Sequence, residues 1–123
     1  PLVGPSSILL AMMSSGLNGN NFSFNGYLPI DKNERSKKIK KLEVHSKNNN
    51  QAQIFIETPY RNQSLFDELI KILNNNTFLC IAKNIGSENQ NIKTMRIKDW
   101  KSKKGVIEKK PTIFIFQSGL ITF

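Results

Sequence analysis

The stretch that decides the fold is Gln53-Ile54-Phe55-Ile56-Glu57-Thr58-Pro59. Its centre is a short, continuous apolar run, which is typical of a strand that is buried on both faces. Thr58 can cap a helix and Pro59 can occupy the first helical position, so a helix is predicted to follow the strand at once. Apolar residues then recur at the three- and four-residue spacing of an amphipathic helix: Leu65, Phe66, Leu69, Ile70, Ile72 and Leu73. A buried strand that leads directly into such a helix indicates an α/β domain.

Four further segments are predicted to be strands of the same sheet. Residues 22–24 alternate apolar and polar side chains, and residues 78–82 and 112–116 are apolar runs. In residues 92–97 charged side chains stand between apolar ones, which favours an edge strand because water can reach the charges. The sequence therefore predicts a mixed, partly antiparallel sheet of about five strands with flanking helices.

A very apolar helix is expected near the start of the chain. Ser6 or Ser7 can cap it, and Gly16 can end it. Its apolar residues, from Ile8 to Met13, leave almost no polar face. Such a helix is expected to be covered on more than one side.

A basic surface helix is expected next. Asp31 and Glu34 have the spacing of a capping box, which would start a helix that runs to about Val44. Ile39 and Leu42 give this helix a narrow apolar seam and leave its basic side chains in water: Arg35, Lys37, Lys38, Lys40 and Lys41. The later helix through Leu69 is expected to stop where residues 74–76, all Asn, supply a left-handed conformation.

Length and composition indicate one globular domain, residues 1–123, with a formal charge of +9. Cys80 is the only cysteine and lies in an apolar run, so we expect a buried thiol and a reducing compartment, the cytoplasm. The longest apolar stretch is far shorter than the roughly 20 residues that span a bilayer, so no membrane partner is expected. The opening residues, which lack Met and read as a loop into a helix, suggest that a lobe of the same chain precedes them.

The residue types present restrict the chemistry. One cysteine and one histidine cannot assemble the three or four ligands of a zinc site, so no metal is expected. No nucleophile stands near a base in a recognisable pattern, and no glycine-rich phosphate loop is present. We therefore assign no catalytic residue. Ligand contacts are instead expected in the loops at the strand ends, where α/β domains usually place them.

These loops resemble, in their order along the chain, the motifs of the tetrapyrrole methylase superfamily. The resemblance covers essentially the whole chain and is greatest to the branch of ribosomal RNA small subunit methyltransferase I. The matching pieces are Gly4-Pro5-Ser6-Ser7, Gly26-Tyr27-Leu28-Pro29, Glu57-Thr58-Pro59-Tyr60-Arg61, Ala82-Lys83-Asn84-Ile85 and residues 111–116.

The resemblance implies that the chain is the C-terminal lobe of a two-lobed, S-adenosylmethionine-dependent methyltransferase. The cofactor would lie in the cleft between the lobes, and the intact enzyme would be a homodimer with ribosomal RNA as a candidate acceptor. By position, the cofactor contacts of this lobe would be Pro5, Ser6, Ser7, Glu57, Thr58, Asn84, Ile85, Pro111 and Thr112.

Two departures from the family pattern concern the acceptor. Tyr60 stands where members of this branch usually carry His, and residues 83–87 replace an Arg-Glu-Leu-Thr-Lys loop. The acceptor therefore stays open between RNA, a tetrapyrrole and another molecule. Two non-catalytic alternatives also stay open. One is an RNA-binding module based on the basic helix and on a basic loop that is expected at residues 101–110, after Trp100, and the other is a dimerisation domain based on the apolar first helix.

Overall fold

A five-stranded mixed sheet is the centre of the computed structural model, which describes residues 5–17, 20–85, 88–103, 107 and 109–119. The strand order across the sheet is β1-β2-β5-β3-β4. Only β1 and β2 run parallel, and the other neighbours pair antiparallel. The strands are β1 (Phe22–Tyr27), β2 (Ala52–Ile56), β3 (Phe78–Lys83), β4 (Asn91–Arg96) and β5 (Thr112–Gln117).

The five predicted strands are confirmed, and so is the predicted edge position of β4. The last strand in the sequence, β5, lies at the centre of the sheet between β2 and β3. All six of its residues are buried. The mixed α/β fold class that the sequence predicts is therefore correct.

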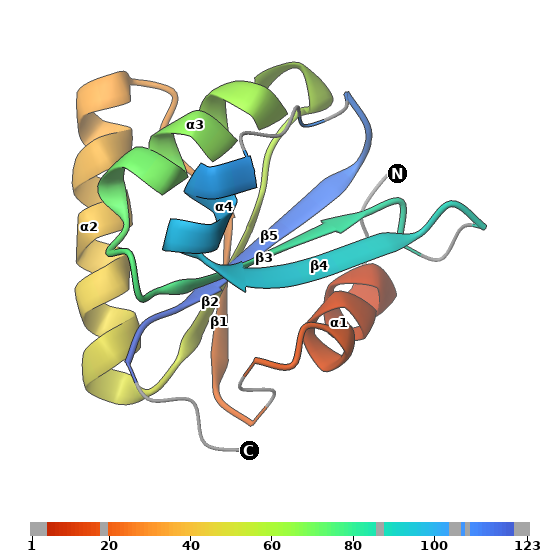
Figure 1. Ribbon diagram of the computed structural model, residues 1–123, viewed down its shortest axis with the longest axis horizontal. Helices are drawn as coiled ribbons and strands as arrows, with labels where there is room; N and C mark the ends of the chain where they lie inside the picture. The colour runs from red at the N-terminus through yellow and green to blue at the C-terminus, as the bar shows by residue number, and fades with distance from the viewer. Residues whose placement is uncertain (1–4, 18–19, 86–87, 104–106, 108, 120–123) are drawn as a thin grey trace.

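The helices lie on the two faces of the sheet (Figure 1). On one face, α2 (Lys32–Asn49), α3 (Asn62–Ile72) and the short α4 (Ile97–Lys103) lie together. The other face carries α1 (Pro5–Ser14), which Figure 1 shows apart from that group. A single 3-10 turn, η1 (Pro59–Arg61), joins β2 to α3.

Alternate residues of the same strands form two separate cores. Phe55, Phe114 and Phe116 face the three helices, and the rings of Phe55 and Phe114 stack with centroids 5.9 Å apart. On the face of α1 the sheet presents smaller side chains, among them Ala52 and Cys80. Small side chains allow a helix backbone to approach the sheet closely. A continuous apolar strand thus serves both cores, because successive side chains point to opposite faces.

The face that carries α1 is only partly covered by the described residues. Phe22 and Phe24 of β1 pair with Ala52 and Ile54, so all four side chains point to this face. Phe22 is 37% exposed and Phe24 is 47% exposed. Met13 of α1 is 73% exposed, although Met12 beside it is buried. The sequence predicted that this helix is covered on more than one side. In the part of the chain that the structure describes, most of the Met13 side chain stays uncovered.

Helix α2 begins as predicted but is longer. The Asp31 carboxylate accepts a hydrogen bond from the Glu34 N–H at 3.0 Å. The helix continues past Val44 to Asn49, and Asn50 ends it in the left-handed conformation at φ 49°. The expected end was too early because tertiary contacts hold the helix beyond Val44: Ser46 is fully buried, and its hydroxyl oxygen accepts a hydrogen bond from the Ser118 N–H at 3.0 Å.

Arg35 was wrongly expected to lie in water. It is only 5% exposed, and its Nε donates to a Glu68 carboxylate oxygen at 2.5 Å. Ser36 donates to the other oxygen of Glu68 at 3.1 Å. Glu68 belongs to α3, so the ion pair lies in the seam between two helices. Only the packing of α3 on α2 could show this, since a buried charge requires a partner, and the partner of Arg35 is 33 residues away in the sequence.

Two further expectations need correction. The helix α3 does not end through a left-handed Asn, because Leu73 stops it in an extended conformation. Residues 101–103, the first part of the expected basic loop, belong to α4 together with Trp100. The Trp100 indole N–H donates to the Leu79 carbonyl oxygen at 2.8 Å, which ties α4 to the sheet. A helix of seven residues is too short to show a clear apolar period.

The buried position of Leu69 leads to a stability prediction. Leu69 is fully buried in the core between α3 and the sheet. Leu69→Ala should lower the free energy of unfolding by about 2 to 5 kcal/mol, because it leaves a cavity that the neighbours fill only in part. Denaturant unfolding measures this loss. Lys71→Ala, on the exposed side of the same helix, is the control, and an equal loss in both variants would contradict the packing of α3.

Cys80 gives a second prediction. Burial raises the pKa of its thiol from 9.0 to about 11, and a hydrogen bond with Thr94 offsets part of this rise. Because the folded pKa lies above the unfolded value, this contribution to stability is complete below pH 9 and is lost as the pH rises through 11. Iodoacetamide at pH 8 should therefore label the chain only after denaturant unfolds it. Rapid labelling of the native chain would show that the thiol is accessible.

Candidate functional site

Three strand ends meet at one edge of the sheet. Ile56, the last residue of β2, pairs with Ile113, and Lys83, the last residue of β3, pairs with Thr112. Because β5 runs antiparallel to both neighbours, its first residues lie between the last residues of β2 and β3. We call this the strand-end edge. The structure thereby brings together six of the nine residues proposed for cofactor contact: Glu57, Thr58, Asn84, Ile85, Pro111 and Thr112.

The remaining three candidates lie in the first turn of α1. Pro5, Ser6 and Ser7 form the beginning of this helix. Ile8, directly after them, packs partly buried on the same core cluster as Ile56 and Ile85. The start of α1 and the strand-end edge thus border one cluster on the less covered face of the sheet.

The Glu57-Thr58 segment is held by its own hydrogen bonds. The Glu57 side chain is 4% exposed, and one of its carboxylate oxygens accepts from the Thr58 N–H at 2.8 Å. The same oxygen lies 3.7 Å from Arg61 Nη1. Thr58 is the N-cap residue of η1, which starts at Pro59. The Thr58 side chain makes no capping hydrogen bond. Glu57 is therefore engaged in shaping the turn. Tyr60, within that turn, is 83% exposed.

The segments around Asn84 and Pro111 are joined through their backbones. The Asn84 N–H donates to the Pro111 carbonyl oxygen at 3.1 Å. Asn84 has φ 53°, so it occupies the left-handed region, which Asn tolerates better than most residues. This conformation turns the chain sharply after β3. The shape of the backbone at the strand-end edge thus depends on residue 84.

Asn62 supports the same edge and was missed in the sequence. It begins α3, is fully buried, and its Nδ2 donates to the Lys110 carbonyl oxygen at 2.8 Å and to Thr112 Oγ1 at 3.2 Å. Thr112 Oγ1 in turn donates to the Lys110 carbonyl oxygen at 2.9 Å. The only signal in the sequence was a polar residue at the start of a helix that follows a strand end. Its partners lie about fifty residues away, so spacing could not identify them.

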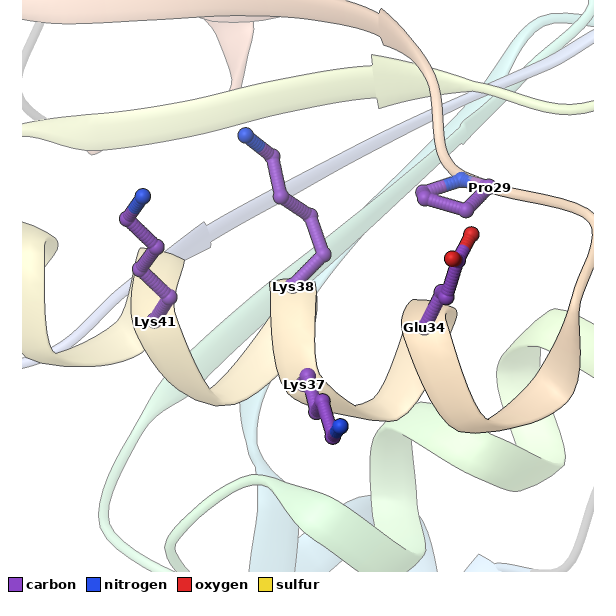
Figure 2. Close-up of a pocket in the computed structure, with 5 residues that line it drawn as sticks. All are labelled: Pro29, Glu34, Lys37, Lys38 and Lys41. Atoms are coloured by element: carbon purple, nitrogen blue, oxygen red, sulfur yellow. The ribbon is translucent and has the colours of Figure 1, made fainter.

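A separate shallow pocket lies on α2. Its volume is about 310 Å³, and it is lined by Pro29, Glu34, Lys37, Lys38 and Lys41. Figure 2 shows Glu34, Lys38 and Lys41 on one side of the helix, with the Glu34 carboxylate near Pro29, whereas Lys37 points to the other side. These charges diverge and lie on a solvent-exposed helix. This pocket therefore does not resemble a site for a cofactor.

The described residues also bear on metal ions and membranes as partners. Within these ranges, no three His, Cys, Asp or Glu side chains lie close enough together to hold a metal ion. None of the helices that the structure describes has the length and apolar character needed to cross a membrane.

Sequence comparisons relate the chain to one kind of enzyme. No family model matches it. It is 31% identical over 85 residues to ribosomal RNA small subunit methyltransferase I of Buchnera aphidicola subsp. Schizaphis graminum, an alignment that covers 69% of this chain and 28% of the relative. The enzyme of the same name from Vibrio cholerae is 27% identical over 95 residues, or 77% of this chain and 32% of the relative. The chain thus spans about a third of the length of these curated relatives.

Comparisons with solved structures confirm the fold. A putative diphthine synthase from Entamoeba histolytica matches with a TM-score of 0.66 at 14% identity, over 94% of this chain and 52% of that protein. The methyltransferase CobJ matches with a TM-score of 0.53 at 14% identity, over 89% of this chain and 47% of CobJ. The cobalt precorrin-4 methyltransferase CbiF matches with a TM-score of 0.54 at 10% identity, over 89% and 48%. The fold of this chain is therefore that of about half of these proteins.

The left-handed conformation of Asn84 leads to a third prediction. Asn84→Val should lower the free energy of unfolding by about 1 to 2 kcal/mol, because a β-branched residue is strained at positive φ. Asn84→Gly should have a much smaller effect, since glycine adopts this conformation freely. Denaturant unfolding of both variants measures the difference. Asn91→Val, in the exposed edge strand β4, is the matched control and should not destabilise the chain. Equal stability of the Val and Gly variants at position 84 would contradict the left-handed assignment.

Proposed function

The chain belongs to the tetrapyrrole methylase superfamily, and from that premise we propose that it is one lobe of an S-adenosylmethionine-dependent methyltransferase. The observation that carries this proposal is the 31% identity to a named methyltransferase over 69% of the chain. The likeness of the fold to methyltransferases of known structure supports it.

The lobe that we propose is the C-terminal one, formed by residues 1–123. The chain matches about half of each solved structure and about a third of each curated relative. On this view a preceding lobe of the same protein supplies the other side of the cofactor cleft, and the activity belongs to the two lobes together.

The proposed cofactor site is the strand-end edge with the start of α1. It combines the main-chain carbonyl oxygens of Thr58 and Pro111, each of which can accept a second hydrogen bond, with the apolar side chains of Ile56 and Ile85. Such a mixture fits S-adenosylmethionine, a ligand with apolar and polar parts, because pockets bind small molecules through mostly apolar walls and a few placed polar groups. The nine residues proposed for contact are Pro5, Ser6, Ser7, Glu57, Thr58, Asn84, Ile85, Pro111 and Thr112.

This lobe would contribute to methyl transfer by positioning the cofactor. The cofactor supplies an activated methyl group on a sulfonium, and transfer requires that the acceptor approach in line with the bond that breaks. Glu57 is poorly placed to act as a base, because its carboxylate is buried and engaged with the Thr58 N–H and Arg61. The lobe's contribution would then be a rigid edge, which the Asn62 and Asn84 hydrogen bonds maintain.

The acceptor that we propose is ribosomal RNA. Two relatives are named as ribosomal RNA methyltransferases, and the chain carries a formal charge of +9, which suits a polyanion. We further propose a cytoplasmic homodimer. The exposed apolar side chains of Met13, Phe22 and Phe24 on one face support an interface there, since exposed apolar groups gathered on one face suit burial against a partner.

Cofactor binding tests the proposal. In the whole protein, Asn84→Val and Ile85→Trp should weaken S-adenosylmethionine binding by about tenfold or more, because main-chain groups near a ligand tolerate neither altered dihedrals nor bulk. Asn91→Val should bind like the unchanged protein. Isothermal titration calorimetry measures the dissociation constants of the unchanged protein and of the three variants.

The chain alone should bind the cofactor weakly, because half a cleft cannot enclose a ligand that pockets normally bury on most sides. Tight binding by residues 1–123 alone would place the site elsewhere. Absence of binding by the whole protein would contradict the methyltransferase proposal itself.

A further inference from the structure

The two tyrosines of the chain, Tyr27 and Tyr60, both lie at the strand-end edge. Tyr27 is the last residue of β1 and pairs with Ile56, the last residue of β2. Because β1 and β2 run parallel, their carboxyl ends lie at the same edge of the sheet. Tyr60 belongs to η1, the turn that leads from the end of β2 into α3. Two aromatic residues from different segments thus flank the end of β2.

These tyrosines are the most exposed aromatic residues that the structure describes. Tyr60 is 83% exposed and Tyr27 is 62% exposed, whereas aromatic residues such as Phe55 and Phe114 are buried in the core. A tyrosine in this position leaves a large planar ring in contact with water. Exposed rings that gather at one edge, next to a proposed ligand site, indicate a binding surface more than apolar residues scattered singly over a protein do.

A bulge in β1 places Tyr27 at this edge. Phe24 pairs with Ile54, and the next recorded pair joins Tyr27 to Ile56, so β1 contains one residue more than β2 between the two pairs. Gly26 lies in this interval at φ 66°, a conformation that glycine adopts freely. A Cβ at Gly26 would meet nothing within 4 Å, so the glycine serves the backbone conformation and not the space around it. Bulges redirect side chains and are frequent next to active sites.

Tyr60 is held in a short turn beside a positive charge. Pro59 starts η1 with its restricted φ, and the Arg61 N–H donates to the Thr58 carbonyl oxygen at 2.9 Å. Arg61 Nη1 lies 3.7 Å from a buried Glu57 carboxylate oxygen, which favours one placement of the guanidinium, and the Arg61 side chain is still 43% exposed. An exposed ring and an accessible cation are thus consecutive residues of one hydrogen-bonded turn.

Resting on the proposed function, we propose that Tyr27 and Tyr60 form a stacking platform for unpaired bases of the acceptor RNA, and that Arg61 contacts a neighbouring phosphate. Single-stranded RNA is commonly bound by stacking its splayed bases on aromatic rings. An arginine beside the rings suits the phosphate, because its guanidinium matches phosphate geometry. Bases on this platform lie next to Thr58 of the proposed cofactor site. The platform thereby brings the acceptor nucleotide to the methyl donor.

The test measures RNA binding by variants of the whole protein that lose a ring and keep the net charge. Tyr60→Leu and Tyr27→Leu remove the aromatic face but keep an apolar side chain, whereas Tyr60→Phe and Tyr27→Phe keep the ring. Binding of a short, fluorescently labelled single-stranded RNA is measured by anisotropy at several salt concentrations. Each Leu variant should bind about fivefold or more weakly, since the loss of one stacked base has an effect of this size. The slope of log affinity against log salt should stay unchanged, because no charge is removed.

The Phe variants should retain most of the binding. Val44→Ala, which shortens an exposed apolar side chain of α2, is the control and should bind like the unchanged protein. Unchanged RNA binding in both Leu variants would overturn the platform, and so would an equal loss in the Leu and Phe variants. Arg61→Gln should lower the salt slope by about 0.7, the contribution of one phosphate contact on a single strand, and an unchanged slope would overturn the phosphate contact.

Two further probes identify the ring that the tyrosines stack. Duplex RNA keeps its bases inside the helix, so its binding should not depend on the tyrosines, and an equal loss for duplex and single strand would contradict stacking. A porphyrin is the other planar ligand that such a platform could hold. If the Leu variants lose the porphyrin and keep the single-stranded RNA, the platform serves a tetrapyrrole and the RNA proposal is wrong.

Cofactor binding separates this proposal from the proposed function. S-adenosylmethionine binding, measured by calorimetry, should be the same in the Leu variants as in the unchanged protein, because neither tyrosine is among the nine residues proposed for cofactor contact. Loss of cofactor binding with retained RNA binding would mean that the rings serve the cofactor, and the platform would be wrong. A whole protein that never binds the cofactor contradicts the proposed function, whereas weaker RNA binding by its Leu variants would still support the platform.

Discussion

The pairing of β5 between β2 and β3 is the constraint on which the rest of the structure depends. This strand comes last in the sequence but occupies the centre of the sheet, and all of its side chains are buried. Its antiparallel register places Thr112 next to Lys83 and Ile113 next to Ile56. The strand-end edge exists only because these pairings bring together segments that are about 25 to 55 residues apart. Without β5 the sheet would fall into two unconnected pairs of strands.

The two faces of the sheet pack differently because β2, β3 and β5 place larger side chains on one face than on the other. The large side chains, such as Phe55 and Phe114, pack under the three helices, and the rings of these two residues stack. The smaller ones, such as Ala52 and Cys80, pack in one cluster with α1. On the same face Phe22 and Phe24 remain exposed among the described residues. The first face therefore holds most of the apolar core, and the second is only partly covered by the described residues.

The candidate site was predictable from the sequence in part. Glu57, Asn84 and Thr112 were proposed through the family resemblance, and the apolar runs beside them predicted that they lie at strand ends, where such domains bind ligands. That these residues meet at one edge follows from the strand order, which no local pattern contains. The supporting role of Asn62 was not predicted, because its partners, the Lys110 carbonyl oxygen and the Thr112 hydroxyl, are remote in the sequence.

The sequence by itself determined the local elements, because apolar spacing and capping residues act over a few positions. It was sufficient for five strands, for the start of α2 at Asp31 and for the amphipathic helix through Leu69. The tertiary structure decided what lies in water and what does not. The sequence predicted that Arg35 lies in water, but its ion pair with Glu68 buries it. The sequence also showed no sign of α4, which the hydrogen bond from Trp100 to the Leu79 carbonyl oxygen ties to the sheet. Whether a side chain is buried or ion-paired depends on which residues lie next to it in space. The order of the strands in the sheet determines those neighbours.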